Sequence, residues 1–118
     1  MKLDEFFRCV GSDYGEAKAR FQNDERIVRF LGMFPGDDSM QNLTNAMNAG
    51  DTPTAFRAVH TLKGVALNLG LGSLAHASSQ MTEALRGQDS MPESVQSLYE
   101  AVQKERTAVC SALEQLEK

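Results

Sequence analysis

The side chains best suited by type and spacing to carry out chemistry lie in the stretch HTLKGVALNLG, residues 60–70. It brings His60, Lys63 and Gly64 close together in a segment that otherwise has a helical pattern. An imidazole can act as a nucleophile near neutral pH or ligate a metal ion. An ammonium group one turn away can offset negative charge on a group held there. The direction in which His60 points therefore decides which of these chemistries is open to it.

Two alternatives to a nucleophilic histidine have little support in the sequence. A metal site needs further ligands at suitable spacing, but His76 lies in another predicted helix, and Cys9 and Cys110 are distant along the chain. A serine hydrolase site would need a nucleophile elbow, which is absent from the sequence. We therefore expect no metal ligands and no cofactor on this chain.

Composition limits the partners and the compartment. The net charge of −4 argues against nucleic-acid binding, which requires a basic surface, and no apolar run is long enough to span a membrane. Acidic residues near the N-terminus argue against a signal peptide. We therefore expect a cytoplasmic protein with reduced cysteines, and a monomer.

Hydrophobic spacing predicts helices throughout the chain and offers no alternating pattern for a strand. The helices are expected at about residues 3–10, 13–34, 39–49, 53–69, 73–86 and 92–117. Because the connections are short, neighbouring helices should be antiparallel. The predicted fold is all-α, a single domain over residues 1–118. Its architecture is an antiparallel up-down four-helix bundle with an additional short N-terminal helix.

A helical projection of residues 53–69 directs His60 away from the core. The apolar seam consists of Ala55, Val59, Leu62, Ala66 and Leu69. Phe56, Leu67, Lys63 and Gly64 share the outward side with His60. A glycine inside a helix costs about 1 kcal/mol relative to alanine, so Gly64 suggests the close approach of a partner. Phe56 and Leu67 would form an apolar docking patch, unless the N-terminal segment folds over one of them.

The sequence from His60 to Gly64, followed by Asn68-Leu69-Gly70, closely resembles the histidine phosphotransfer (HPt) domain of bacterial multistep phosphorelays. The resemblance extends over about residues 13–86 and includes the Phe-Pro turn at residues 34–35. It implies that His60 accepts a phosphoryl group from a receiver-domain aspartate and passes it to a response-regulator aspartate. It also implies that Lys63 stabilises the phosphoryl group, that Gly64 leaves room for it, and that the partner receiver supplies Mg²⁺. The chain would then have no independent catalytic activity.

The resemblance also directs attention to the next helix, which must lie beside His60. Members of the family often orient the histidine ring with a glutamine, but Thr82 stands at the position that we align, with Gln80 two residues earlier. Both are candidates for orienting the ring, and Arg86 is a second candidate for stabilising the phosphoryl group. Arg57 and Asn68 join Phe56 and Leu67 as candidate docking residues. His76 is expected to face solvent without a role.

Two other functions remain open from the sequence. The phosphoacceptor domain of a chemotaxis-type histidine kinase has a similar bundle and a related H-x-x-K-G helix. In that family an acidic residue usually assists the histidine and a kinase core follows; we assign neither feature to this sequence and favour phosphotransfer between receivers. A helical scaffold with an incidental histidine is the third possibility.

Overall fold

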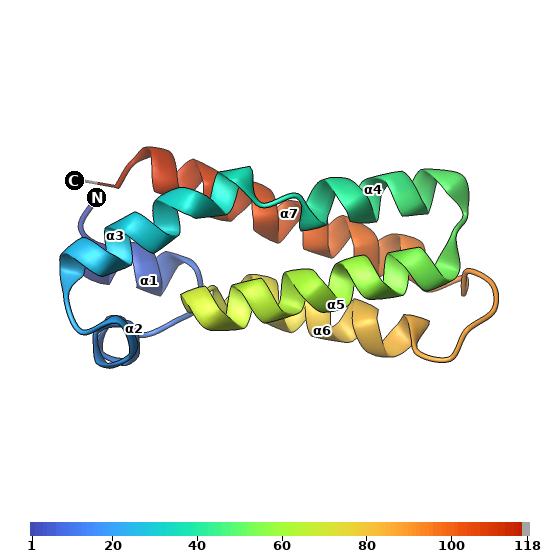
Figure 1. Cartoon of the computed structure of the whole chain (residues 1–118), viewed down its shortest axis with the longest axis horizontal. Coiled ribbons are helices and arrows are strands. Elements are labelled where there is room, and N and C mark those ends of the chain that lie inside the picture. Colours follow the sequence, from blue (N-terminus) through green and yellow to red (C-terminus); the bar gives the residue numbers. More distant parts are fainter. Residues whose placement is uncertain (117–118) are drawn as a thin grey trace.

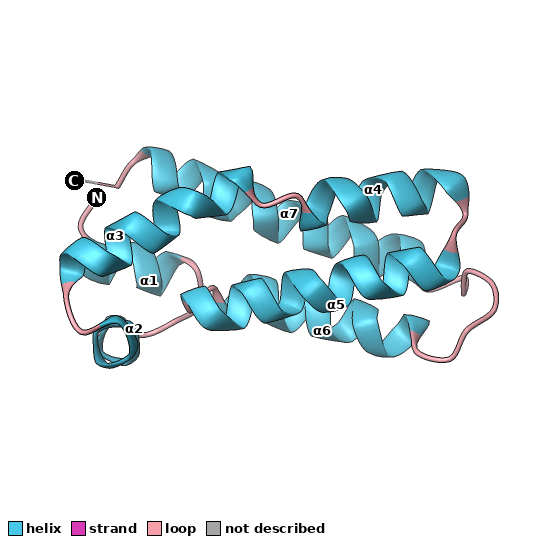
Figure 2. Cartoon of the chain, viewed as in Figure 1, coloured by secondary structure: helices cyan, strands magenta, loops and turns pink. Residues whose placement is uncertain are grey.

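Helices are the only regular elements in residues 1–116, the part of the chain described by the structure, which is a computed structural model (Figure 2). The predicted all-α class is therefore confirmed. None of the described helices is long and apolar enough to cross a membrane. The elements in chain order are α1 (Leu3–Cys9), α2 (Tyr14–Phe21), α3 (Asp24–Met33), the 3-10 turn η1 (Phe34–Gly36), α4 (Ser39–Ala49), α5 (Thr52–Leu69), α6 (Gly72–Leu85) and α7 (Val95–Glu114).

The long helices form an elongated bundle. In Figure 1, α3 and α4 lie nearly end to end across η1, above α5, while α6 and α7 complete the bundle. Helix α4 packs on α5, α5 on α6, and α6 on α7. The reversals after α4 and α5 are made by Gly50 and Gly70, whose φ angles of 67° and 72° are in the left-handed region that favours glycine. These tight turns make α4, α5 and α6 antiparallel neighbours.

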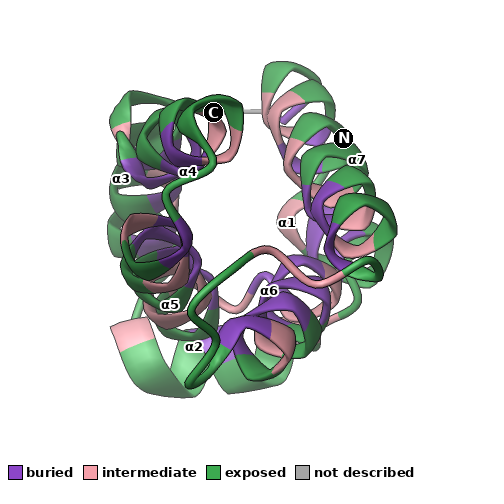
Figure 3. Ribbon diagram, turned by 90° about the vertical axis from the view of Figure 1, so that its right-hand side faces the viewer, coloured by how far each residue is buried: buried purple, intermediate pink, exposed green. Residues whose placement is uncertain are grey.

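The core contains the seam that the sequence predicted for α5. Ala55, Val59 and Ala66 are 0% exposed and Leu62 is 1% exposed, while Leu69 is half-buried. Viewed along the bundle, the buried positions lie on the sides of the helices that face one another (Figure 3). Burial of each large aliphatic side chain contributes about 1.5–3 kcal/mol to stability. The seam therefore fixes the rotation of α5 about its axis, and with it the direction of the opposite face.

The prediction of a single helix over residues 13–34 is wrong, because this segment forms two helices, α2 and α3. Gln22 has a φ of 77°, which ends α2, and the Asn23 side chain accepts a hydrogen bond from the Arg26 backbone N–H at 2.9 Å to cap α3. The apolar spacing continues across this break, so periodicity alone does not detect it. The local signal is Asn23 followed by acidic residues in the first turn of α3.

The N-terminal segment holds the C-terminal end of α5. From α2, Arg20 Nη1 donates to the carbonyl oxygens of Leu67 at 2.6 Å and Asn68 at 2.9 Å. The Leu67 carbonyl also accepts a hydrogen bond from the Gly70 backbone N–H at 3.3 Å, so Arg20 adds a second donor there and supplies a donor to Asn68 at the helix end. The segment nevertheless leaves the Leu67 side chain 52% exposed. The alternative in which this segment buries Leu67 is therefore wrong.

Candidate functional site

His60 lies in the middle of α5 and is exposed, in agreement with the helical projection. Its ring stacks on Phe56, which lies one turn earlier on α5. The ring centroids are 6.0 Å apart and the ring planes differ by 4°. Phe56 is half-buried, so it offers the imidazole an apolar neighbour that the bundle holds in place. Because His60 is exposed, a partner can reach its imidazole.

Lys63 and Gly64 follow His60 on the next turn of α5, and both are half-buried. Apart from its chain neighbours and the adjacent backbone of α5, a Cβ atom added at Gly64 would meet no atom within 4 Å. Gly64 is therefore not required for close packing inside this chain. The space beside His60 is open to a group that arrives from outside, and the role of Gly64 in giving access to the site stays a prediction.

Arg86, from the end of α6, reaches the same surface. Its guanidinium carbon lies 5.3 Å from the centroid of the Phe56 ring, a cation–π arrangement. Arg86 also pairs with Glu83 through two hydrogen bonds, from Nε to Oε2 at 3.2 Å and from Nη2 to Oε1 at 3.0 Å. Phe56 is thus the common neighbour of the His60 imidazole and the Arg86 guanidinium.

Glu83 is a residue of this site that the sequence analysis missed. The hydrogen bonds from Arg86 lower the pKa of the Glu83 carboxyl below its ordinary value, and the charges of Lys63 and His60 act in the same direction. The same pairing raises the pKa of Arg86. An acidic residue therefore stands near His60, contrary to the sequence analysis, which assigned none. The signal that could have revealed it is the spacing of three residues between Glu83, in the last turn of α6, and Arg86, which directly follows that helix.

The structure does not support the two candidates for orienting the ring. Thr82 is 0% exposed, and its hydroxyl donates to the Ser78 carbonyl oxygen at 2.7 Å. Its only hydroxyl proton is thereby used within α6, so Thr82 has none to donate to His60. Gln80 lines a hollow between α6 and α7, together with His76 and Glu105. That hollow lies on the α7 side of α6, whereas His60 is on α5.

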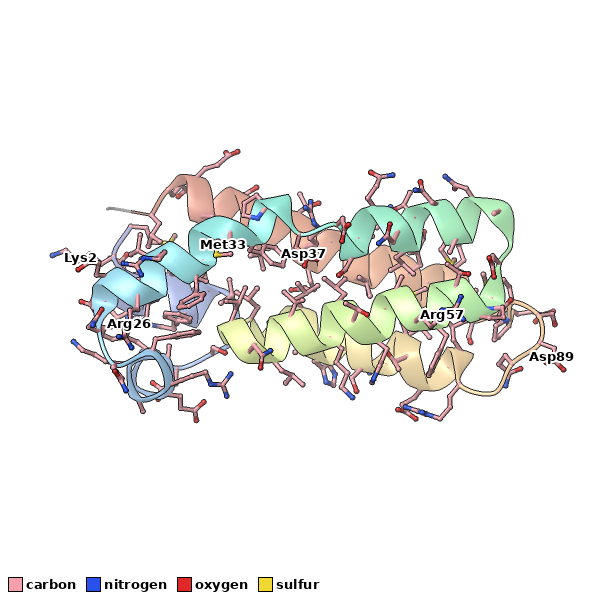
Figure 4. All side chains as sticks on the ribbon, in the orientation of Figure 1. Lys2, Arg26, Met33, Asp37, Arg57 and Asp89 are labelled. Carbon is pink, nitrogen blue, oxygen red and sulfur yellow. The ribbon has the colours of Figure 1, made fainter. Side chains whose placement is uncertain are left out.

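The remaining docking candidates occupy two separate places along α5. Arg57 lies near the end of α5 that connects to α4, where its Nη2 donates to Thr54 Oγ1 at 3.1 Å (Figure 4). Asn68 is exposed near the opposite end of α5. Arg57 lies one turn before His60 and Asn68 about two turns after it, so the two are about three turns apart on α5, and their part in docking stays a prediction.

An apolar groove beside the C-terminal half of α5 was not foreseen from the sequence. It lies between α3 and α5 and is lined by Phe30, Met33, Val65 and Leu69, with other residues around η1. The side chains of Phe30 and Met33 are 41% and 65% exposed. The predicted single helix over residues 13–34 placed these residues along one helix, and its packing on α5 could not be read from the sequence.

Within residues 1–116, no three His, Cys, Asp or Glu side chains are grouped so that they could hold a metal ion. A model of the Hpt domain family matches residues 36–118, which include α4, α5, α6 and α7. No curated protein and no solved structure matches the chain significantly. Proteins with this domain carry phosphoryl groups on histidine in two-component signalling and interact with receiver domains. The matched segment covers more than half of the chain and contains the helix with His60, so the chain belongs to the Hpt domain family.

Proposed function

We propose that His60 receives a phosphoryl group from the aspartate of one receiver domain and passes it to the aspartate of another. The observation that carries this proposal is the exposed imidazole in the middle of α5 of an Hpt domain, with open space at Gly64 beside it. The sequence contains two histidines, and the other, His76, lines the hollow between α6 and α7.

The transfer follows from the chemistry of the imidazole. The unprotonated ring nitrogen of His60 attacks the phosphorus atom of the aspartyl phosphate, forming a P–N bond while the bond to the carboxylate oxygen breaks. The aspartate leaves as a carboxylate, and the second ring nitrogen keeps its proton. The reverse sequence delivers the phosphoryl group to the next aspartate. Such a transfer depends chiefly on positioning and on stabilisation of the charge of the phosphoryl oxygens.

The surrounding residues have distinct roles in the proposal. Lys63, one turn after His60, offsets the charge of the phosphoryl oxygens, and Arg86 provides a second cation from α6. Gly64 leaves room for the approaching group. Phe56 and Leu67 offer apolar surface to the receiver domain, which would supply the Mg²⁺. The chain itself then acts as a carrier.

The proposal is tested by phosphorylating the protein with a phosphorylated receiver domain and locating the label by mass spectrometry at neutral pH. We expect the label on His60, its loss in His60→Gln, and unchanged labelling in the matched variant His76→Gln. Labelling of His76, or full labelling of His60→Gln, would show that His60 is not the carrier.

A second candidate function is that of the phosphoacceptor domain of a chemotaxis-type kinase, because Glu83 supplies an acidic residue near His60. In the structure, however, both carboxylate oxygens of Glu83 accept hydrogen bonds from Arg86. The two functions differ in the source of the phosphoryl group. Phosphorylation of His60 by an ATP-bound kinase domain, without return from phosphorylated receivers, would favour the second function.

A further inference from the structure

Glu83 places a negative charge beside a site that must hold a phosphoryl group of nearly two negative charges. By itself this carboxylate would repel the phosphoryl oxygens. The proposed transfer chemistry gives Glu83 no role, yet two hydrogen bonds tie it to Arg86, one of the two cations that the proposed function assigns to the phosphoryl group. Any role of Glu83 at this site therefore acts through its contact with Arg86.

The contacts form a continuous series from α6 to α5. Glu83 holds the guanidinium of Arg86 at 3.0 and 3.2 Å, the guanidinium carbon lies 5.3 Å from the centroid of the Phe56 ring, and that centroid lies 6.0 Å from the centroid of the His60 ring. The carboxylate thus fixes Arg86 against the ring on which the reactive imidazole stacks.

The ion pair between Arg86 and Glu83 is weak enough for Arg86 to exchange one anionic partner for another. The side chains of Arg86 and Glu83 are 53% and 58% exposed, and ion pairs in water at that exposure are weak. A phosphoryl group offers three acceptor oxygens and a larger charge than a carboxylate, and a guanidinium binds such oxygens in a bidentate manner. Once His60 is phosphorylated, Arg86 has a stronger competing partner on the same surface.

We propose that Glu83 is a positioning residue that holds Arg86 on Phe56 while His60 is unphosphorylated and releases it to the phosphoryl group when His60 carries one. This inference rests on the proposed function of His60. The exchange makes and breaks only hydrogen bonds and ion pairs. Its effect is to keep a cation close to His60 without leaving it free to bind other anions.

The exchange predicts competition between Glu83 and the phosphoryl group for Arg86. In Glu83→Gln the guanidinium is free to pair with the phosphoryl group, so the pKa of the second phosphoryl ionisation should fall, by up to about 0.7 unit. Loss of the carboxylate charge alone would also lower this pKa. The two causes are separated by repeating the substitution in an Arg86→Gln background, since only the exchange requires the guanidinium.

The experiment uses the full chain phosphorylated with phosphoramidate, which donates its phosphoryl group to histidine and releases ammonia. The ³¹P chemical shift of the phosphohistidine is then followed against pH in the parent, Glu83→Gln, Arg86→Gln and the double variant. The matched control is Glu25→Gln, which removes the carboxylate of an exposed pair with Arg29, 3.6 Å apart on α3. A heteronuclear spectrum of the Arg86 Nε–Hε group reports its partner before and after phosphorylation.

We expect the pKa to fall in Glu83→Gln, to fall by less when the same substitution is made in the Arg86→Gln background, and to be unaffected by Glu25→Gln. In the parent, the Arg86 Nε–Hε signal should move on phosphorylation. An equal fall in both backgrounds would show that Glu83 acts only through its charge, and no fall at all would show that it does not compete; either result overturns the inference. If the parent forms no phosphohistidine at residue 60, the proposed function itself is refuted, and the inference with it.

Discussion

Replacing Gly64 should change the stability of the protein and the rate of phosphoryl transfer in opposite directions. The residue lies in the interior of α5, and an added Cβ would meet no atom within 4 Å. Alanine is favoured over glycine in a helix by about 1 kcal/mol, and nothing in the chain offsets this gain. Gly64→Ala should therefore raise the free energy of unfolding by about 1 kcal/mol, which corresponds to about 4 °C in Tm for a domain of this size.

The same methyl group should slow phosphoryl transfer, because it occupies the space beside His60 through which a receiver approaches. Gly64→Gln enlarges the obstruction while its helix propensity still exceeds that of glycine. We expect transfer to decrease from the parent to Gly64→Ala and further to Gly64→Gln, with both variants at least as stable as the parent. Thermal unfolding measures the first effect, and the initial rate of transfer from a phosphorylated receiver domain measures the second.

The chain provides a matched control in Gly32, in α3, where an added Cβ would also meet no atom within 4 Å. Gly32→Ala should stabilise the protein in the same direction and leave transfer unchanged. Unchanged transfer by Gly64→Gln would refute the role of Gly64 in access to the site. A lower Tm of Gly64→Ala would instead refute the open geometry around this residue.

Three further predictions follow from single contacts. Lys63→Ala should slow transfer or shorten the lifetime of phosphorylated His60, while unfolding changes by no more than about 0.5 kcal/mol; equal lifetimes in parent and variant would make the lysine a bystander. Thr82→Val should leave transfer unchanged and alter stability by less than about 1 kcal/mol, because its hydroxyl bonds a carbonyl that already serves the helix; a fall in transfer rate would restore its role in orienting the ring. Arg20→Ala removes two hydrogen bonds of 2.6 and 2.9 Å from the end of α5 and should lower stability by about 1 kcal/mol in urea unfolding; an unchanged midpoint would show that α2 does not hold α5.

The direction of His60 was predictable from the sequence because one helix contains both the seam and the reactive face. Val59 and Leu62 must turn towards the core, and the fixed rotation per residue then carries His60 outward. The break between α2 and α3 was not predictable in this way. The apolar period continues through Gln22, and the interruption depends on a single left-handed residue and the cap that follows it.

The contribution of α6 to the site could be predicted only in part. Which residue of α6 faces α5 depends on how the two helices rotate and cross, and the sequence of α6 alone does not determine this. Alignment to a motif placed Thr82 beside the ring, whereas packing turns it into the core. Arg86 reaches Phe56 because its long side chain extends from the end of the helix. Glu83 belongs to the site only through its hydrogen bonds to Arg86. The sequence analysis did not place Arg86 against Phe56, and it therefore missed Glu83.

Under the proposed function, the exposure of the site explains how one helix would serve both transfer and storage of a phosphoryl group. Arg86 and Glu83 lie in water, where interactions between charges are weak. When a receiver domain covers this face, water is excluded and the same charges act more strongly on the transferring group. The free carrier then provides only part of the stabilisation that transfer requires, and the partner completes it. Under the proposed function, transfer between His60 and a receiver aspartate is therefore fastest in the complex, while the buried seam of α5 keeps the exposed face in position in both states.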